Sequence, residues 1–245
     1  MKEKIVGILG GMGPFATVYF FSKILELTGA KKDQDHLRII IDNNPKIPDR
    51  TLSIKKEAED PLPFLIESAK LLEKAGADFI VIPCVTAHYF LPDLKKAVKI
   101  PILSIIEETV RYIKKQEFEK FGLLATTGTI NAKLFDEPLK RLKRKIITPD
   151  ASDQERLVME AIYGENGIKR VGANEKAKNL ILEAVKKLID KGAQAIIEGC
   201  TEIPLVLKED DVSVPIIDVL TVLARATVDV AKGRMSAPEC PFPGD

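Results

Sequence analysis

The sequence predicts an α/β protein built from two similar lobes, each with a parallel sheet. Two observations support this prediction. Short apolar runs alternate with helical patterns along the chain, which is typical of strand–helix–strand units in a parallel sheet. Segments of the first half recur in the same order in the second half, which indicates a duplicated unit. With 245 residues, of which 45% are hydrophobic, the chain can bury a sizeable core.

The first lobe begins with an apolar run at residues 5–9 and a glycine turn, Gly10-Gly11-Met12-Gly13. The turn lacks the G-x-G-x-x-G spacing of a dinucleotide loop and is not followed by Gly-Lys-Ser/Thr. We therefore interpret it as a close approach of the backbone to a small substrate, with Met12 lining the pocket or, failing that, packing in the core. Further elements of this lobe are predicted as helices at 16–27, 61–75 and 87–97 and strands at 38–42, 78–82 and 101–103.

The second lobe repeats three blocks of the first. One alignment places LEKAGADFIVIPC, residues 72–84, without a gap on LIDKGAQAIIEGC, residues 188–200. The others match VGILGGMG (6–13) with FGLLATTG (121–128), and VKIPILSI (98–105) with VSVPIIDV (212–219). One such match is common in α/β proteins, but three in the same order indicate duplication. We place the first lobe at 1–105 plus 216–245 and the second at 106–215, with the helix at 219–232 returning to the first lobe.

Composition excludes several classes of function. The chain has 37 basic and 36 acidic residues and no basic stripe with interleaved aromatics, so we expect no nucleic-acid partner. No apolar run approaches the roughly 20 residues of a membrane helix, and the start MKEKIVGILGG does not resemble a signal peptide. We therefore expect a cytoplasmic protein without a membrane partner. Its three cysteines do not make a disulfide framework, and a reducing compartment would keep them as thiols.

Cys84 and Cys200 occupy equivalent positions in the repeat, each just after a predicted strand. Ligands of open parallel sheets bind beyond the carboxyl ends of the strands, so we expect both thiols to face an active site in the cleft between the lobes. Inverting a carbon stereocentre requires a base on one face of the carbon and an acid on the other. A thiol, with a pKa of about 8.5 that the start of a helix can lower, suits either role. Cys240, in the proline-rich tail, is interpreted as an ordinary small apolar residue.

The two histidines, His36 and His88, do not stand at metal-ligand spacing from a cysteine, and we predict no metal site. His88 follows Cys84 by one helical turn. It is interpreted as a packing or capping residue, with tuning of the thiol as the alternative.

Five motifs point to a known family. They are GILGGMGPFAT (7–17), NNPKIPDRT (43–51), IPCVTAH (82–88), LLATTGTI (123–130) and EGCTEIPL (198–205). Together they resemble the aspartate racemase branch of the aspartate/glutamate racemase family, and the resemblance spans residues 5–230. It implies an isomerase that interconverts L- and D-aspartate, or glutamate, without pyridoxal phosphate or another cofactor. It further implies that Cys84 and Cys200 are the two catalysts and that the protein is a homodimer.

The resemblance also implies the groups that bind an acidic substrate. Arg50 matches an arginine whose planar fork holds the distal carboxylate, and Lys169, after Ile162-Tyr163, matches a lysine of the second lobe. Glu202 stands where glutamate racemases carry a histidine that assists the second thiol, and we interpret it as a tuning group or as a first-turn acid. The α-carboxylate is expected to meet turn hydroxyls, which are alternatively helix caps: Thr86, Thr126, Thr127 and Thr201.

Val85 departs from the family pattern, in which an asparagine follows the first cysteine. The change removes a polar contact to the substrate, although the backbone amides of Val85 and Thr86 remain to bind a carboxylate. Two alternatives therefore stay open. One is a carboxylate-binding protein without activity or with altered specificity. The other is a different isomerase of the superfamily, of the maleate or hydantoin type; arylmalonate decarboxylases typically keep one of the two cysteines, which argues against that branch.

Overall fold

The computed structural model describes residues 3–238 and contains two compact units. Unit 1 comprises Met1–Glu108 and Leu220–Asp245, and unit 2 comprises Thr109–Val219. Each unit holds one four-stranded sheet in which all paired strands are parallel, which confirms the predicted fold class. The unit boundaries lie a few residues later in the chain than the predicted lobe boundaries. Cys240 lies outside the described residues.

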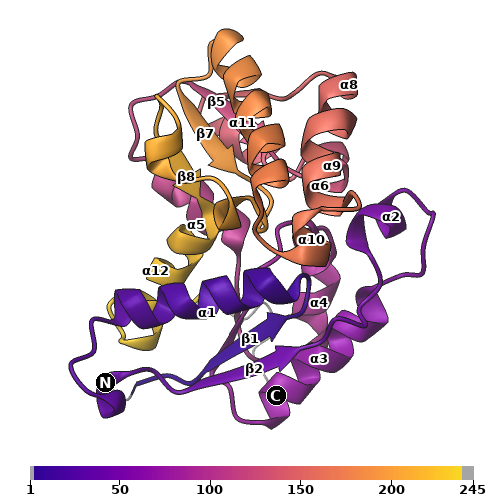
Figure 1. Ribbon diagram of the computed structural model, residues 1–245. Coiled ribbons are helices and arrows are strands. Elements are labelled where there is room, and N and C mark those ends of the chain that lie inside the picture. Colours follow the sequence, from indigo (N-terminus) through magenta and orange to yellow (C-terminus); the bar gives the residue numbers. More distant parts are fainter. Residues whose placement is uncertain (1–2, 239–245) are drawn as a thin grey trace. The chain divides into compact units, whose positions relative to one another are not determined.

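The sheet of unit 1 has the strand order β2-β1-β3-β4, and Figure 1 shows helices on both of its faces. The chain passes into unit 2 within α5 and returns at the start of α12. The strands are β1 (Val6–Gly10), β2 (Ile39–Asn43), β3 (Phe79–Val81) and β4 (Ile102–Leu103), and the helices are α1 (Pro14–Thr28), α2 (Arg50–Ile54), α3 (Leu62–Lys74), α4 (Leu91–Ala97), α5 (Ile105–Ile113) and α12 (Val219–Ala231), with 3-10 turns at Asp33–Asp35 and Thr86–Phe90.

The helices of unit 1 start and end where local chemistry favours it. Helix α1 begins at Pro14, because proline at the first helical position loses no intrahelical hydrogen bond, and it ends at Gly29, whose φ is 64°. Figure 1 places α1 and α3 on opposite faces of β1 and β2. Helix α3 turns Leu65, Ala69 and Leu72, at helical spacing, into a fully buried core.

One prediction for unit 1 was wrong in detail, and one helix was missed. The segment predicted as one helix at 87–97 starts as a 3-10 turn, Thr86–Phe90, and becomes α-helical at Leu91–Ala97. Helix α2 was not predicted, although its signal is present: Asp49 caps it, with the carboxylate accepting a hydrogen bond from the Leu52 amide at 2.9 Å.

The sheet of unit 2 has the order β6-β5-β7-β8. Its strands are β5 (Lys120–Leu124), β6 (Lys145–Ile147), β7 (Ala195–Glu198) and β8 (Ile216–Asp218). Its helices are α6 (Thr127–Asn131), α7 (Asp136–Arg141), α8 (Ala151–Asp153), α9 (Glu160–Tyr163), α10 (Ile168–Val171) and α11 (Glu175–Asp190), with a π-helical segment at Gln154–Met159 and 3-10 turns at Ile203–Leu205 and Glu209–Asp211.

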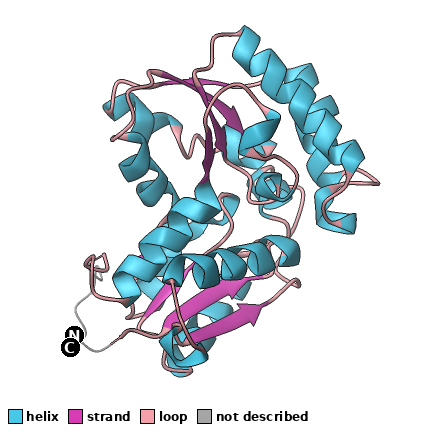
Figure 2. Cartoon of the chain, turned by 60° about the vertical axis from the view of Figure 1, so that its left-hand side comes forward, coloured by secondary structure: helices cyan, strands magenta, loops and turns pink. Residues whose placement is uncertain are grey.

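Helix α11 supplies much of the core of unit 2. Asn174 caps its start, accepting a hydrogen bond from the Ala177 amide at 2.9 Å, and Ile181, Val185 and Leu188 are buried along one stripe. These side chains share a core cluster with Ile196 of the central strand β7. Figure 2 shows the strands as two separate sheets, each flanked by helices, as a duplicated α/β unit requires.

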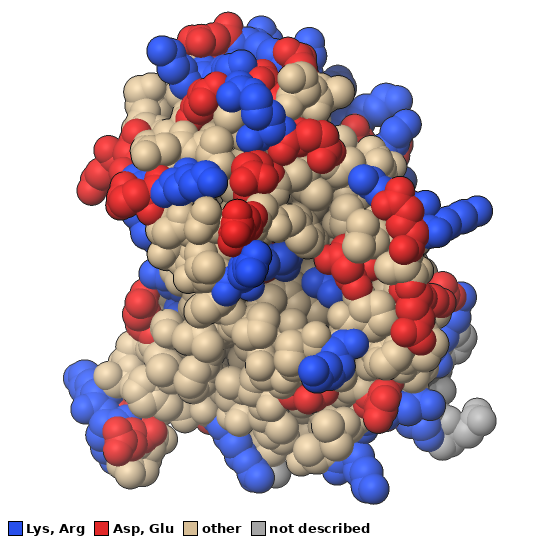
Figure 3. Space-filling model, turned by 45° about the vertical axis from the view of Figure 1, so that its right-hand side comes forward, with Lys and Arg blue, Asp and Glu red and all other residues tan. Residues whose placement is uncertain are grey.

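The surface carries charges of both signs, in agreement with the nearly equal numbers of basic and acidic residues. Figure 3 shows basic and acidic side chains interspersed over the face drawn. Within residues 3–238, no helix is both long and apolar enough to span a membrane.

Candidate active site

Three predicted site residues of unit 1 follow three neighbouring strands. Met12 follows β1, Arg50 follows β2, and Cys84 follows β3. Because β1 is hydrogen-bonded in parallel to both β2 and β3, the carboxyl ends of the three strands lie at one edge of the sheet. This edge is where open parallel sheets bind ligands.

The turn after β3 buries Cys84 with the two residues that follow it. Cys84 is 5% exposed, Val85 2% and Thr86 6%, and Cys84 is a free thiol. The Cys84 amide donates to the Ile82 carbonyl oxygen at 2.8 Å, which tightens the turn between the strand and the 3-10 helix. The predicted catalyst thus lies in a buried, hydrogen-bonded turn.

His88 fixes this turn rather than contacting the thiol. Its Nδ1 lies 2.9 Å from the Cys84 carbonyl oxygen, and its Nε2 lies 3.1 Å from the Ile105 amide nitrogen. An amide can only donate, so Nε2 accepts, and Nδ1 carries the proton that it donates to the Cys84 carbonyl. Burial lowers the pKa of His88 to about 4, which keeps the ring neutral. These contacts support the packing role over tuning of the thiol.

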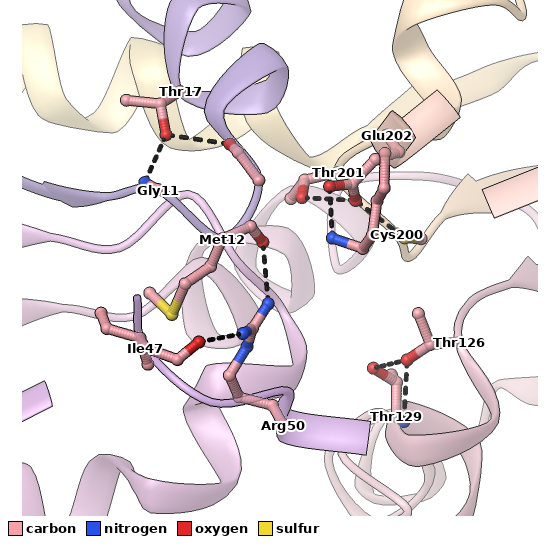
Figure 4. Close-up of polar contacts among 12 residues, drawn as sticks. Gly11, Met12, Thr17, Ile47, Arg50, Thr126, Thr129, Cys200, Thr201 and Glu202 are labelled. Atoms are coloured by element: carbon pink, nitrogen blue, oxygen red, sulfur yellow. Dashed lines mark hydrogen bonds and ion pairs between the residues drawn. The ribbon is translucent and has the colours of Figure 1, made fainter. Parts of the chain in front are cut away.

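Arg50 is buried, and backbone carbonyl groups orient its guanidinium. Nη1 donates to the carbonyl oxygens of Ile47 at 3.2 Å and Pro48 at 2.9 Å, and Nη2 donates to that of Met12 at 3.4 Å (Figure 4). The structure therefore brings together Arg50 and Met12, two residues that the sequence placed in the site. Their contact to a substrate stays a prediction.

The glycine turn after β1 approaches another part of the chain. A Cβ atom on Gly11 would lie 2.4 Å from the carbonyl carbon of Asn44, and Gly11 has a φ of +90°. The close approach at Gly11 is thus to the backbone of Asn44, whereas the predicted approach of this turn to a small substrate stays a prediction. The Gly11 amide donates to Thr17 Oγ1 at 2.9 Å (Figure 4). Met12 is 2% exposed and belongs to the unit 1 core.

In unit 2, Cys200 belongs to a chain of buried polar side chains. Its Sγ donates to Glu202 Oε2 at 3.1 Å, and the Thr201 hydroxyl donates to the same oxygen at 3.2 Å (Figure 4). Lys169 Nζ, on α10, lies 2.6 Å from Glu202 Oε1 and 5.5 Å from the centre of the Tyr163 ring. Lys169, which the resemblance implied as a site residue, thus reaches the loop of the second cysteine.

Burial, and not a helix start, has the largest effect on the pKa of the Cys200 thiol. Burial raises the pKa of this thiol well above its ordinary value, and the negative charge of Glu202 raises it further. The helix that follows is a three-residue 3-10 turn, Ile203–Leu205, which supplies little helix dipole. Cys200 is therefore a thiol in this structure, which is the form that gives a proton.

The threonines of the turn after β5 are engaged within unit 2. Thr126 caps α6: its hydroxyl oxygen accepts from the Thr129 amide at 3.3 Å and lies 3.2 Å from the Thr129 hydroxyl (Figure 4). The Thr127 hydroxyl donates to Glu155 Oε1 at 2.9 Å. Capping, one of the two predicted roles, is confirmed for Thr126, while substrate contacts of Thr86, Thr126, Thr127 and Thr201 stay predictions.

Sequence reasoning missed a buried acid next to Cys200. Glu198 ends β7, is 1% exposed, and its Oε1 has no hydrogen-bond partner. Burial raises its pKa well above the ordinary value, and Asp218, its register partner on β8, raises it further. The signal was an acidic residue at the end of an otherwise apolar strand, where a solvated position is rare.

Within residues 3–238, no group of three or more His, Cys, Asp or Glu side chains is placed to hold a metal ion. The chemistry that these residues themselves offer is proton transfer: two buried thiols, one of them hydrogen-bonded to a carboxylate.

Known proteins of one family share this sequence and fold. The family model described as Asp/Glu/Hydantoin racemase matches residues 9–227. The broad specificity amino-acid racemase RacX of Bacillus subtilis is 31% identical over 231 residues, covering 91% of this chain and 96% of that protein. Among solved structures, the aspartate racemase of Picrophilus torridus is 32% identical, with a TM-score of 0.83 and 94% of each chain covered.

A further solved structure, an aspartate racemase homologue from Pyrococcus horikoshii, is 26% identical with a TM-score of 0.72, covering 94% of this chain and 99% of that one. The family resemblance predicted from the five sequence motifs is confirmed. The chain therefore belongs to the Asp/Glu/hydantoin racemase family and is an amino-acid racemase, an isomerase.

Proposed function

We propose that this protein interconverts L- and D-aspartate by proton transfer at the α-carbon, with Cys84 and Cys200 as the two acid/base catalysts and without a cofactor. The observation that carries the proposal is the equivalence of the two thiols. Each follows the third strand of its sheet, in the block of sequence that the two halves share, and each is buried and free. Two equivalent catalysts suit a reaction whose substrate and product are mirror images.

In the proposed reaction, the thiolate of one cysteine takes the α-proton, and the electron pair of the C–H bond stays on the carbon. The thiol of the other cysteine then gives its proton to the opposite face of that carbon. The amino acid leaves inverted, and the two cysteines have exchanged protonation states. The hydrogen bond from Cys200 to Glu202 supports Cys200 as the proton donor of one direction.

Arg50 is proposed to hold the distal carboxylate of the substrate. Three backbone carbonyl contacts fix the guanidinium, so little side-chain entropy is lost on binding an anion. Lys169 is proposed as a second cation for an acidic substrate, and the Thr86, Thr126, Thr127 and Thr201 hydroxyls or amides as partners of the α-carboxylate.

A broader substrate range is a second candidate. The Bacillus subtilis relative is named a broad specificity racemase, and Val85 places an apolar side chain, 2% exposed, directly after Cys84. A buried valine offers no hydrogen bond to the substrate and therefore discriminates less between side chains than an amide does.

Hydrogen exchange in heavy water distinguishes these two candidate functions. Each enantiomer of aspartate, glutamate and a panel of neutral and basic amino acids is incubated with the protein in deuterium oxide, and loss of the α-proton signal is followed together with optical rotation. Exchange with racemisation of aspartate supports the proposal, and activity across the panel supports the broad range. Thermal stabilisation by aspartate without exchange would identify a binding protein, and the Cys84→Ala/Cys200→Ala double variant is the control.

Val85→Asn tests how specificity is set. The amide adds a hydrogen bond to a charged group of the substrate, worth about 1.5–3 kcal/mol, so kcat/KM for aspartate should rise on the order of tenfold or more. Val85→Ala is the matched control, because it removes the valine without adding a polar group. Equal values in Val85→Asn and Val85→Ala would contradict this role of the position.

A homodimer is also proposed, as the family resemblance implies. Helix α1 supports it by exposing apolar side chains, with Phe15 45% and Val18 65% exposed. Light scattering of the purified protein checks the mass, and Val18→Glu is expected to lower it to that of one chain. An unchanged mass in Val18→Glu would exclude α1 from the interface.

A further inference from the structure

The polar chain around Cys200 uses both oxygens of one buried carboxylate. Glu202 Oε2 accepts from the Cys200 thiol, and Oε1 lies 2.6 Å from Lys169 Nζ. The side chain of Glu202 is 2% exposed and that of Lys169 19%. Lys169 comes from α10, which is 33 residues from Glu202 in sequence, so this contact depends on the fold of unit 2.

This geometry assigns the protons. The Lys169 ammonium, at ion-pair distance, keeps the buried Glu202 ionised. An ionised carboxylate has no proton to donate, so the hydrogen bond between Glu202 and Cys200 requires the proton on sulfur. Thiolate at Cys200 would place two negative charges 3.1 Å apart in a buried site.

The charged and polar groups that face the Cys200 sulfur shift the pKa of the thiol in opposite directions. After burial, the carboxylate of Glu202 raises the pKa of the thiol, whereas Lys169 and the backbone amide of Glu202 lower it. Glu202 and Lys169 therefore oppose each other at the sulfur.

We propose that Glu202, held by Lys169, keeps Cys200 protonated when no substrate is bound, so that the first turnover uses Cys200 as the proton donor and Cys84 as the base. Glu202 and Lys169 are positioning residues, because they act through Cys200. The consequence for turnover rests on the proposed function, but the state of the Cys200 thiol does not.

Alkylation of the intact protein with iodoacetamide measures that state. The rate is followed at Cys200 and Cys84 separately, by mass spectrometry of peptides, from pH 6 to 10. In Glu202→Gln the neutral amide removes the negative charge that raises the pKa of the thiol, so more of Cys200 is thiolate and it should react roughly tenfold faster at pH 8. In Lys169→Met the ion that keeps Glu202 ionised is lost, and Glu202 takes up a proton. Cys200 should then also react faster than in the wild type, but less so than in Glu202→Gln, because Glu202 raises the pKa of the thiol more than Lys169 lowers it.

An effect confined to Cys200 distinguishes this role from loss of structure, which would accelerate alkylation of both cysteines in both variants. Lys178→Met is the matched control, because Lys178 forms a 2.6 Å ion pair with Asp211 elsewhere in unit 2, and it should leave the Cys200 rate unchanged. An unchanged Cys200 profile in Glu202→Gln, or equal acceleration of Cys84 and Cys200 in both variants, would overturn the proposal. If the wild type gives the expected alkylation but racemises no amino acid, only the proposed function fails.

Discussion

His88 links the first cysteine turn to the next element of unit 1. Its ring joins the Cys84 carbonyl to the Ile105 amide, at the start of α5, and both contacts require the neutral ring with its proton on Nδ1. A histidine next to a catalytic cysteine suggests a base, but these contacts use both ring nitrogens for the backbone. The residue therefore contributes to the position of the thiol through stability of the turn.

The folding stability should report this role. Burial lowers the pKa of His88 from 6.5 to about 4. Between these two pH values the unfolded chain binds a proton at this histidine and the folded chain does not. The stabilisation is thus complete above pH 6.5 and is lost as the pH falls. The loss in the free energy of unfolding amounts to about 3 kcal/mol by pH 4. Urea unfolding of the wild type and His88→Asn at several pH values measures it. The variant should be less stable at pH 7, and the difference should shrink toward pH 4; a constant difference would contradict the assignment.

At the scale of elements, the two units repeat the same helix-to-strand connection. Gly76 follows α3 with a φ of +92°, and Gly192 follows α11 with a φ of +91°. The hydrogen bonds match as well: Gly76 donates to Glu73 and Ala77 to Leu72, as the corresponding amides of unit 2 do to Ile189 and Leu188. This is the hydrogen-bonded helix end that favours glycine, because only glycine adopts positive φ without strain.

Gly76→Ala and Gly192→Ala should therefore destabilise the protein by similar amounts, about 1–2 kcal/mol each. A Cβ atom at either position meets nothing within 4 Å, so the cost is conformational and not steric. Asparagine tolerates the left-handed region better, and Gly76→Asn and Gly192→Asn should cost less than the alanine variants. Urea unfolding gives the four values; a neutral alanine variant would contradict the argument.

At this scale, the sequence predicts features that depend on local signals and misses contacts between elements that are distant in sequence. The repeat placed β3 and β7, and with them Cys84 and Cys200, because hydrophobic strands and glycine turns are local signals. The Lys169–Glu202 ion pair and the His88–Ile105 hydrogen bond join residues 33 and 17 positions apart, across elements whose packing no local pattern specifies. The raised pKa of the Cys200 thiol could not be predicted for the same reason: burial and the Glu202 carboxylate raise it, and both depend on the fold.

At the scale of the whole molecule, each unit supplies one proposed catalyst, but the surroundings of the two differ. The strand order and glycine turns of the units match, whereas the residue two positions after Cys200 is an acid, Glu202, and the residue two positions after Cys84 is Thr86. A histidine, His88, also follows Cys84, and its ring binds backbone. Duplication thus retained the framework that positions the thiols, while the side chains around them diverged. A reaction between mirror images requires both protonation states in turn, so this divergence should be visible in single-cysteine variants.

Cys84→Ala and Cys200→Ala should each lose racemisation by at least about a thousandfold, since inversion needs a donor on the face opposite the base. Each should retain α-proton exchange in deuterium oxide with one enantiomer only, and the two variants should select opposite enantiomers. In Cys84→Ala the remaining base is Cys200, whose raised pKa confines exchange to alkaline pH; adding Glu202→Gln should move that exchange toward neutral pH. Proton NMR of both enantiomers across pH measures these rates. Exchange of the same enantiomer in both variants would mean that the thiols do not act on opposite faces. If adding Glu202→Gln leaves the pH dependence of exchange in Cys84→Ala unchanged, Glu202 does not hold the proton on Cys200.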